Sequence, residues 1–142
     1  MPVACPFCNF SETRVFLRAP GVVGLWDAYP VSPGHALLVP LRHVSNWFEA
    51  TPADRTGLVE AIDQAKTHID TLYSPHGYNI GINCGAAAGQ TIFHLHVHLI
   101  PRYNEDVRDP RGGVRHVIPG KANYLSDLTT MDEKRNNAAQ DE

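Results

Sequence analysis

The sequence is poor in cysteine, with three among its 142 residues. Two of them stand close together as Cys5 and Cys8, a spacing that indicates metal or redox chemistry before a disulfide framework. Long apolar runs are also missing, since no stretch approaches the roughly 18 residues that span a bilayer. The first residues show neither the basic start nor the apolar segment of a secretion signal. We therefore expect a cytoplasmic protein without a membrane segment.

A strong excess of charge is missing as well, because the net charge is −3 with the histidines neutral. This balance argues against a broad electrostatic contact with nucleic acid, although a local cluster of imidazoles and amides can still hold one anionic substrate. The length and the 43% of hydrophobic residues suit one globular domain. We expect this domain at residues 1–103 and a C-terminal extension at residues 104–142, with about the last 12 residues disordered.

The hydrophobic pattern predicts an α+β domain with a largely antiparallel sheet. We expect its strands at residues 13–17, 22–26, 36–40, 78–83 and 93–100, and residues 114–118 are apolar enough for a further short strand. One helix is expected from Pro52 to about Tyr73, because Thr51 is a good N-cap and proline favours the first helical position. Its apolar stripe consists of Leu58, Ile62, Ala65, Ile69 and Leu72.

Three histidines alternate with apolar residues in the last of these strands, at His94, His96 and His98. Alternate side chains of a strand point to opposite faces, so the three imidazoles should share one face while the residues between them enter the core. A histidine-rich polar face without function is one interpretation. Zinc binding by the His-x-His pattern is another, and the spacing alone favours it as much as nucleophilic catalysis.

The loop before these histidines favours catalysis on a phosphate. Small residues at positions 85–89 let backbone amides approach a ligand closely, and converging amides suit an anion. Gln90 and Thr91 add side-chain donors. A neutral imidazole is nucleophilic near pH 7, and the phosphoramidate that it forms is reactive enough for water to cleave. We therefore expect phosphoryl or nucleotidyl transfer.

Two segments, residues 83–102 and residues 33–40 with their Gly-His pair, resemble the histidine-triad (HIT) family. The likeness extends over about residues 4 to 103, and the chain resembles the bacterial type of this family with a Cys-x-x-Cys zinc knuckle. It implies a HIT-like, five-stranded, largely antiparallel sheet with a main helix and a short second helix. It also implies a homodimer, with sheets joined edge to edge.

The resemblance implies a hydrolase or transferase that cleaves the bond at the α-phosphate of a purine nucleotide, either a dinucleoside polyphosphate or a nucleoside phosphoramidate. His96 would be the nucleophile and carry the nucleotide, and His98 would contact the α-phosphate and assist the leaving group. His35 and His94 would orient and polarise the site. Asp27 would accept from the ribose hydroxyls. Phosphate oxygens would be held by Asn83, Gly89, Gln90 and Thr91, and the base would rest among Phe7, Phe10, Leu25 and Trp26.

The Cys5 and Cys8 pair alone does not separate a metal site from a redox motif or a chance pair. The resemblance implies that His43 and His94 complete a structural zinc site, in which four protein ligands leave no position for a reacting water. Two other functions stay open at this point. One is a nucleotide-binding module without catalysis, and the other is a metalloenzyme with zinc on His94, His96 and His98.

Overall fold

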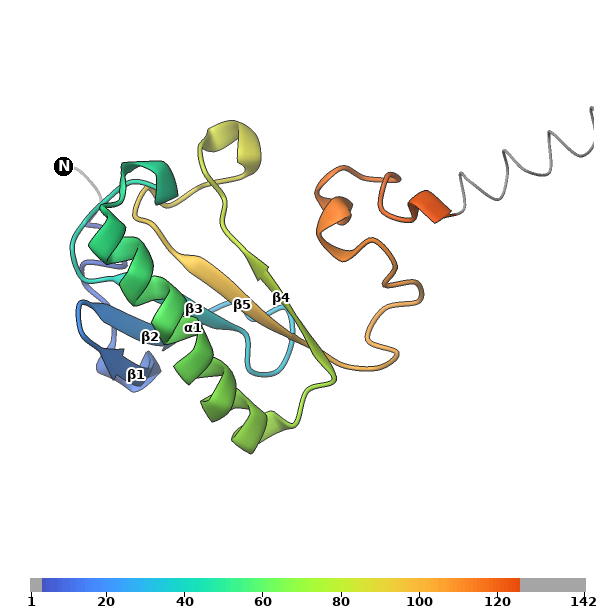
Figure 1. Ribbon diagram of the computed structural model, residues 1–142, viewed down its shortest axis with the longest axis horizontal. Helices are drawn as coiled ribbons and strands as arrows, with labels where there is room; N and C mark the ends of the chain where they lie inside the picture. Colours follow the sequence, from blue (N-terminus) through green and yellow to red (C-terminus); the bar gives the residue numbers. More distant parts are fainter. Residues whose placement is uncertain (1–3, 126–142) are drawn as a thin grey trace, which may run out of the picture. The chain divides into compact units, whose positions relative to one another are not determined.

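The computed structural model describes residues 4–125 and contains one five-stranded sheet. Its strands follow the order β1-β2-β3-β5-β4 across the sheet, and every neighbouring pair is antiparallel (Figure 1). The strands are β1 (Val15–Ala19), β2 (Val22–Trp26), β3 (Ala36–Pro40), β4 (Gly77–Gly81) and β5 (Val97–Arg102). The predicted α+β class and antiparallel sheet are therefore confirmed.

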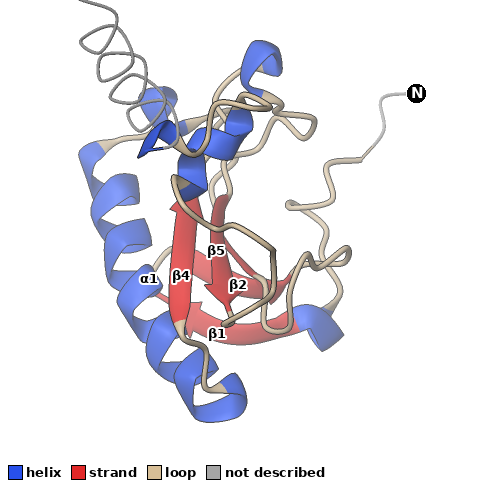
Figure 2. Ribbon diagram, turned by 90° about the vertical axis from the view of Figure 1, so that its right-hand side faces the viewer, coloured by secondary structure: helices blue, strands red, loops and turns tan. Residues whose placement is uncertain are grey.

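A single long helix, α1 (Pro52–Tyr73), lies along one side of the sheet (Figure 2). It begins at a capping box, in which the hydroxyl of Thr51 accepts from the backbone of Asp54 and the Asp54 carboxylate accepts from the backbone of Thr51. It ends where Ser74 adopts the left-handed conformation. The buried residues of α1 lie at helical spacing, as expected for one face packed on a sheet: Leu58, Ala61, Ala65 and Ile69.

The sheet separates two apolar clusters. Alternate residues of the central strands pack on the α1 side, as Leu38 and Val97 do. The residues between them, such as Val23 and Leu37, form a second cluster on the opposite face. Because side chains alternate along a strand, the apolar runs in β2 and β3 supply both clusters. The face opposite α1 is therefore available for a site.

The observed bounds match the predicted ones for α1, β2 and β3. The largest difference is at β5, which begins at Val97 and not at Phe93. The backbone N–H of Leu95 donates to the carbonyl of Val44 at 2.7 Å. The chain before Val97 thus bonds to the loop after β3 and does not pair with a strand.

The chain divides into two units, residues 1–104 and residues 105–142. In the described part of the second unit, Gly113–Val117 forms a 3-10 helix, so the short strand expected at residues 114–118 is wrong. Gly112 before it has φ of 88°, and a Cβ there would lie 1.8 Å from the carbonyl oxygen of Ala122. Only glycine fits this approach.

The short second helix expected from the sequence has several 3-10 counterparts among residues 4–125, where α1 is the long α-helix and residues 124–125 are also helical. Besides the 3-10 helix in the second unit, these are Glu12–Arg14, Trp47–Glu49 and Ala86–Ala88. The terminal residues expected to be disordered lie outside the described part of the chain. Within that part, no helix is both long and apolar enough to cross a bilayer.

Candidate functional site

The alternation predicted for the histidines holds even though β5 starts at Val97. Leu95 and Val97 pack in the cluster beneath α1. On the opposite face, the ring centroids of His96 and His98 lie 5.1 Å apart, and the His98 ring lies 5.2 Å from that of His35. Three imidazoles from two segments thus gather on the face away from the helix.

His96 is held by its own chain. Its Nδ1 lies 2.8 Å from the carbonyl oxygen of His94, which can only accept a hydrogen bond, so Nδ1 carries the proton. When the ring is neutral, the other nitrogen, Nε2, has a lone pair. The side chain is buried, with 8% of its surface exposed, yet it lines a pocket on this face. The neutral His96 ring therefore carries its lone pair on Nε2, and the ring lines the cavity.

A backbone amide determines the protonation of two further rings. The N–H of Val31 donates to Nδ1 of His35 at 3.1 Å, so the proton of a neutral His35 ring is on Nε2. That Nε2 lies 3.0 Å from Nδ1 of His98 and 3.4 Å from Oδ2 of Asp27. Because Nδ1 of His98 accepts this hydrogen bond, the proton of His98 is on Nε2. At Nε2, His98 is therefore a hydrogen-bond donor, whereas the neutral His96 ring has a lone pair at that atom.

The hydrogen bond from His35 to His98 forms a relay between the two rings. Burial keeps both of these rings neutral. The pKa of His98 is lowered to about 4, chiefly by burial and in addition by the positive charges that His96 and His35 would carry, while Asp27 opposes the shift. Burial also lowers the pKa of His35, again against the attraction of Asp27. At neutral pH the relay therefore runs between uncharged imidazoles.

A pocket of about 610 Å³ contains most of the residues predicted from the sequence. Its size is that of a site for a small organic ligand. His96 and His98 lie in its wall with Asp27, which follows β2, and His35, which precedes β3. The other predicted residues in the wall are Asn83, Gly89, Thr91 and Phe7.

The side chain of Gln90, which the sequence predicts to hold a phosphate oxygen, makes internal hydrogen bonds in the structure. Its side chain is buried, and its amide oxygen accepts from the backbone of Gly85 at 2.8 Å. Its amide nitrogen donates to the carbonyls of Ser45 at 2.7 Å and Ile92 at 3.1 Å. Both amide hydrogens are therefore used, and Gln90 ties its loop to the loop after β3. The backbone amide of Gly89 is likewise used, by the carbonyl of Ala86.

The residues expected to bind the base lie on both faces of the sheet. Phe7 lines the pocket, and Leu25 is buried in the apolar cluster on the same face of the sheet. Phe10 packs at the edge of that cluster. Trp26 lies on the α1 side, where its ring stacks on Phe16 at 4.0 Å, so its assignment to the base is corrected. The reason is the alternation of β2, which sends Leu25 and Trp26 to opposite faces.

Sequence reasoning missed several residues of the pocket wall. Arg14 lies in it, with Nε donating to the carbonyl of Trp26 at 3.0 Å. Pro6, Tyr29 and Val31 are also part of the wall. Arg14 carried no signal, because it falls inside the expected first strand while the structure places it in a 3-10 helix before β1. The positive charge of Arg14 in a pocket wall that also contains the imidazoles suits an anionic ligand.

A second cluster joins Cys5, Cys8, His43 and His94, whose ligand atoms all lie within 4.8 Å of one another. Nδ1 of His94 is 3.4 Å from Sγ of Cys5 and 3.6 Å from Sγ of Cys8, and Nδ1 of His43 is 3.2 Å from Sγ of Cys8. Tetrahedral zinc holds sulfur and nitrogen ligands about 3.6 Å apart. Both the donor set and the spacing therefore fit zinc.

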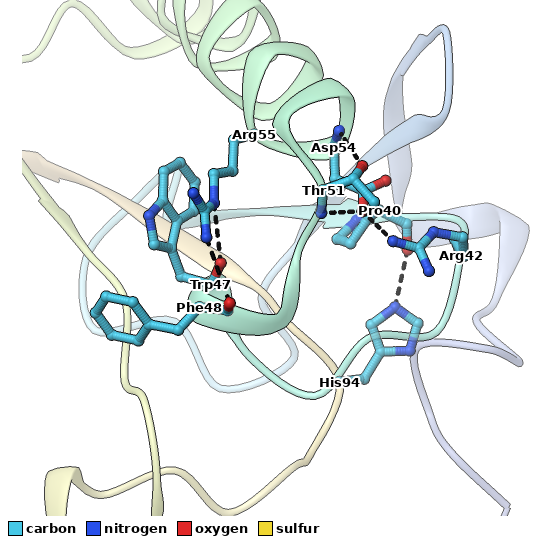
Figure 3. Close-up of polar contacts among 8 residues, drawn as sticks. All are labelled: Pro40, Arg42, Trp47, Phe48, Thr51, Asp54, Arg55 and His94. Atoms are coloured by element: carbon cyan, nitrogen blue, oxygen red, sulfur yellow. Dashed lines mark hydrogen bonds and ion pairs between the residues drawn. The ribbon is translucent and has the colours of Figure 1, made fainter.

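The protonation of His94 fits the same metal. Its Nε2 lies 2.8 Å from the carbonyl oxygen of Pro40 and so donates to it (Figure 3). This leaves the lone pair on Nδ1, toward the thiols. A carbonyl on the second nitrogen is the usual partner of a metal-binding histidine. With both ring nitrogens directed elsewhere, His94 is not arranged to share a metal with His96 and His98. This counts against the metalloenzyme alternative.

The loop that carries His43 is fastened to the start of α1. Figure 3 shows the guanidinium of Arg42 directed at the Asp54 carboxylate. It also shows Arg55 reaching the loop carbonyls, with Nε 3.1 Å from that of Trp47. The Arg42 hydrogen bond holds the pKa of Asp54 below its usual value. These contacts fix the loop between β3 and α1, and with it the position of His43.

Comparison with known proteins gives one consistent result. The model of the HIT domain matches residues 10–105. A Mycobacterium tuberculosis protein named AP-4-A phosphorylase is 35% identical over 102 residues, which are 71% of this chain and 52% of that protein. The asymmetrical bis(5'-nucleosyl)-tetraphosphatase of Schizosaccharomyces pombe is 36% identical over 75% of this chain and 59% of its own. The chain thus spans a little over half the length of these relatives.

Solved structures of similar fold include a HIT family protein from Bacillus anthracis. It has a TM-score of 0.69 and 28% identity, and the match covers 95% of this chain and 96% of that one. A zinc-bound histidine triad family protein from Mycobacterium smegmatis has a TM-score of 0.65 and 30% identity, over 75% of this chain and 84% of its own. The described fold is therefore shared along most of both chains.

Proposed function

The chain belongs to the HIT family, and we propose that it is a nucleotide hydrolase or transferase that cleaves the bond at the α-phosphate of a purine nucleotide. Two substrate classes fit this proposal, dinucleoside polyphosphates and nucleoside phosphoramidates. The names of the two relatives favour the first class. The chemistry at the α-phosphorus is the same for both.

The observation that carries the proposal is the state of His96. A nucleophilic imidazole needs one nitrogen with a lone pair at the substrate and the other held as N–H by an acceptor. The carbonyl of His94 is such an acceptor at 2.8 Å, and the ring lines the pocket. The positive charge that develops on the ring during attack is stabilised by this same hydrogen bond.

The first step forms a bond between Nε2 of His96 and the α-phosphorus and breaks the bond from that phosphorus to the leaving group. The leaving atom takes the electron pair of the broken bond; the Nε2–H of His98 donates a hydrogen bond to a phosphate leaving group and transfers its proton to an amine leaving group. In the second step water, or another acceptor, forms a bond to the phosphorus, the bond from phosphorus to Nε2 breaks with its electron pair returning to Nε2, and the proton of the water passes to His98 where that ring has given up its own, or otherwise to solvent; the nucleoside monophosphate is thereby released. Splitting the reaction in this way replaces one difficult displacement by two easier ones.

The remaining residues of the pocket bind the substrate. Asp27 accepts from the ribose hydroxyls, and Asn83 and Thr91 donate to phosphate oxygens. These assignments follow the resemblance and agree with the position of the three side chains in the pocket wall. Phe7 and Ile92 supply apolar surface there for the base.

Zinc, when bound by Cys5, Cys8, His43 and His94, supplies structural stability, because four protein ligands leave no open position for substrate or water. The residues of this cluster serve to fix the N-terminal segment beside the pocket. His94 contributes to the reaction through its backbone carbonyl and not through its ring.

The direct test replaces His96 by alanine. We expect His96→Ala to bind AMP about as well as the unchanged chain and to lose turnover of dinucleoside polyphosphates and AMP amidates by several orders of magnitude, as expected for loss of a nucleophile. His116→Ala is the matched control, since His116 is exposed and lies in the second unit. Unchanged turnover in His96→Ala would overturn the assignment. AMP binding without turnover in the unchanged chain would indicate a binding module.

A further inference from the structure

The short segment between the two N-terminal cysteines reaches into the pocket. Pro6 and Phe7 both line it, and Phe7 is buried, with 4% of its surface exposed. The Phe7 ring lies 4.8 Å from the His96 ring, centroid to centroid, at an interplanar angle of 53°. It also meets the His94 ring edge to face at 6.0 Å and 85°. The segment thus contacts the candidate nucleophile as well as a metal-cluster histidine.

The orientation of the His96 ring depends on three neighbours. Its Nδ1 donates to the His94 carbonyl, the His98 ring lies 5.1 Å away, and the Phe7 ring packs against it. A single hydrogen bond at Nδ1 leaves the ring able to rock about its bond to Cβ, since the last torsion of histidine is broad. Packing against Phe7 removes that freedom, because a displaced ring would meet the phenyl group.

Phe7 is itself held from two sides. It packs in the apolar cluster formed by Val23, Leu25, Leu37 and Val39. The turn that carries it is closed by backbone hydrogen bonds from Cys8 at 3.2 Å and Asn9 at 3.1 Å to the carbonyl of Cys5. Sγ of Cys5 lies 3.4 Å from Nδ1 of His94. The Phe7 ring is therefore held by the apolar cluster on one side and, on the other, by a turn whose Cys5 thiol lies beside His94.

We infer that Phe7 is a positioning residue for the nucleophile: its ring holds the His96 imidazole in the orientation that directs Nε2 into the pocket. The cysteine segment then acts on the reaction through an apolar contact, in addition to any structural role of its thiols. This inference rests on the proposed function for its kinetic consequence. Its structural part, the ordering of the His96 ring, does not need a substrate.

Two substitutions separate positioning from simple stability. Phe7→Ala removes the ring contact, and we expect kcat to fall by roughly 10- to 100-fold, the scale of a small misplacement of a reacting group. KM should rise as well, because Phe7 also supplies surface for the base, but a residue that only holds the base would leave kcat unchanged. Phe7→Leu keeps apolar volume against His96 and should recover most of kcat. Val39→Ala is the control, because Val39 belongs to the same apolar cluster but does not line the pocket.

The second readout is the protonation form of the His96 ring in the absence of substrate. It is measured by nitrogen-15 NMR of the full chain, at one pH and equal metal content. We expect one Nδ1–H form in the unchanged chain, in Phe7→Leu and in Val39→Ala, and a mixture of ring forms in Phe7→Ala. Unaltered His96 signals together with unaltered kcat in a folded Phe7→Ala would overturn the inference. If the unchanged chain turns over none of the nucleotides, the proposed function fails, and the NMR comparison still decides the role of Phe7.

Discussion

At the scale of single residues, the partner of one ring nitrogen decides what each histidine does. The Pro40 carbonyl fixes Nε2 of His94 as a donor and leaves Nδ1 for the thiols. The His94 carbonyl does the opposite for His96, since it holds Nδ1 and leaves Nε2 at the pocket. The same side chain is therefore suited to metal binding in one case and to nucleophilic attack in the other.

The relay through His35 predicts that the direction of its hydrogen bond matters more than its bulk. Glutamine at this position can still donate to Nδ1 of His98, whereas glutamate can only accept and would draw the His98 proton away from Nε2. We expect His35→Glu to lose roughly 10²–10⁴-fold in kcat, the usual scale of a misplaced proton donor. His35→Gln should lose much less. Equal losses in two folded variants, measured on the same nucleotide, would contradict the relay.

The lowered pKa of His98 predicts a pH dependence of stability. Its pKa is about 4 in the folded chain, and about 6.5 is expected for the unfolded chain. Between these values the unfolded state binds more protons, so the free energy of unfolding falls as the pH is lowered from about 6.5 to 4. The His98→Asn variant has no ionisable group at this position and so lacks this contribution to the pH dependence of stability. We expect denaturant titrations to show the stability of the unchanged chain falling relative to His98→Asn across this window.

The comparison of two chains also controls for the thiol and imidazole cluster, since both chains contain it. Curves that stay parallel from pH 6.5 to 4 would show that His98 is not a buried neutral ring.

At the scale of elements, loops do as much as strands to build the site. The segment before β5 bonds to the loop after β3 through Leu95 and Val44, and Gln90 adds hydrogen bonds to Ser45 and Gly85. These contacts position His94 and His96 before the sheet pairing begins at Val97. The histidine segment is therefore held from both ends, by the loop on one side and by the sheet on the other.

The internal hydrogen bonds of Gln90 predict a structural effect of its removal. Gln90→Ala leaves the Gly85 amide and the Ser45 and Ile92 carbonyls without these partners. We expect the free energy of unfolding to fall by about 2–3 kcal/mol, as for buried polar groups that lose their partners. Denaturant unfolding measures this loss. A variant of unchanged stability whose KM for nucleotide rises would instead favour the phosphate contact expected from the sequence.

Local signals account for most of what the sequence predicts correctly. Thr51 and Pro52 mark the start of α1, and the apolar runs of β2 and β3 end at turns, so these bounds depend only on near neighbours. The start of β5 depends on Val44, which is far away in the sequence. Gln90 and Arg14 could not be assigned for the same reason, because their partners are set by how separate segments meet in the fold.

At the scale of the molecule, the cysteine and histidine cluster joins parts of the first unit that are distant in sequence. Cys5 and Cys8 come from the N-terminal segment, His43 from the loop after β3, and His94 from the segment before β5. Closing such long loops restricts the unfolded chain, and metal binding at a preformed site adds to the free energy of folding. Zinc here would stabilise the same segments that carry the pocket.

This arrangement predicts one zinc per chain, bound by the thiols. We expect elemental analysis of the chain purified without added chelator to find it, and the double variant Cys5→Ser with Cys8→Ser to lose it and to melt at a lower temperature. Cys84→Ser is the matched control, since Cys84 lies outside the cluster. Zinc retained in full by the double variant would place the metal on other ligands.

The most direct measurement of the account as a whole is the capture of a nucleotide on the protein. The chain is mixed with a dinucleoside polyphosphate or an AMP amidate, quenched within the first turnover, digested and examined by mass spectrometry. We predict a nucleoside monophosphate attached to His96, in the unchanged chain and in His116→Ala, and no such adduct in His96→Ala. Turnover with no adduct at any time, or an adduct on a different residue, would contradict the account.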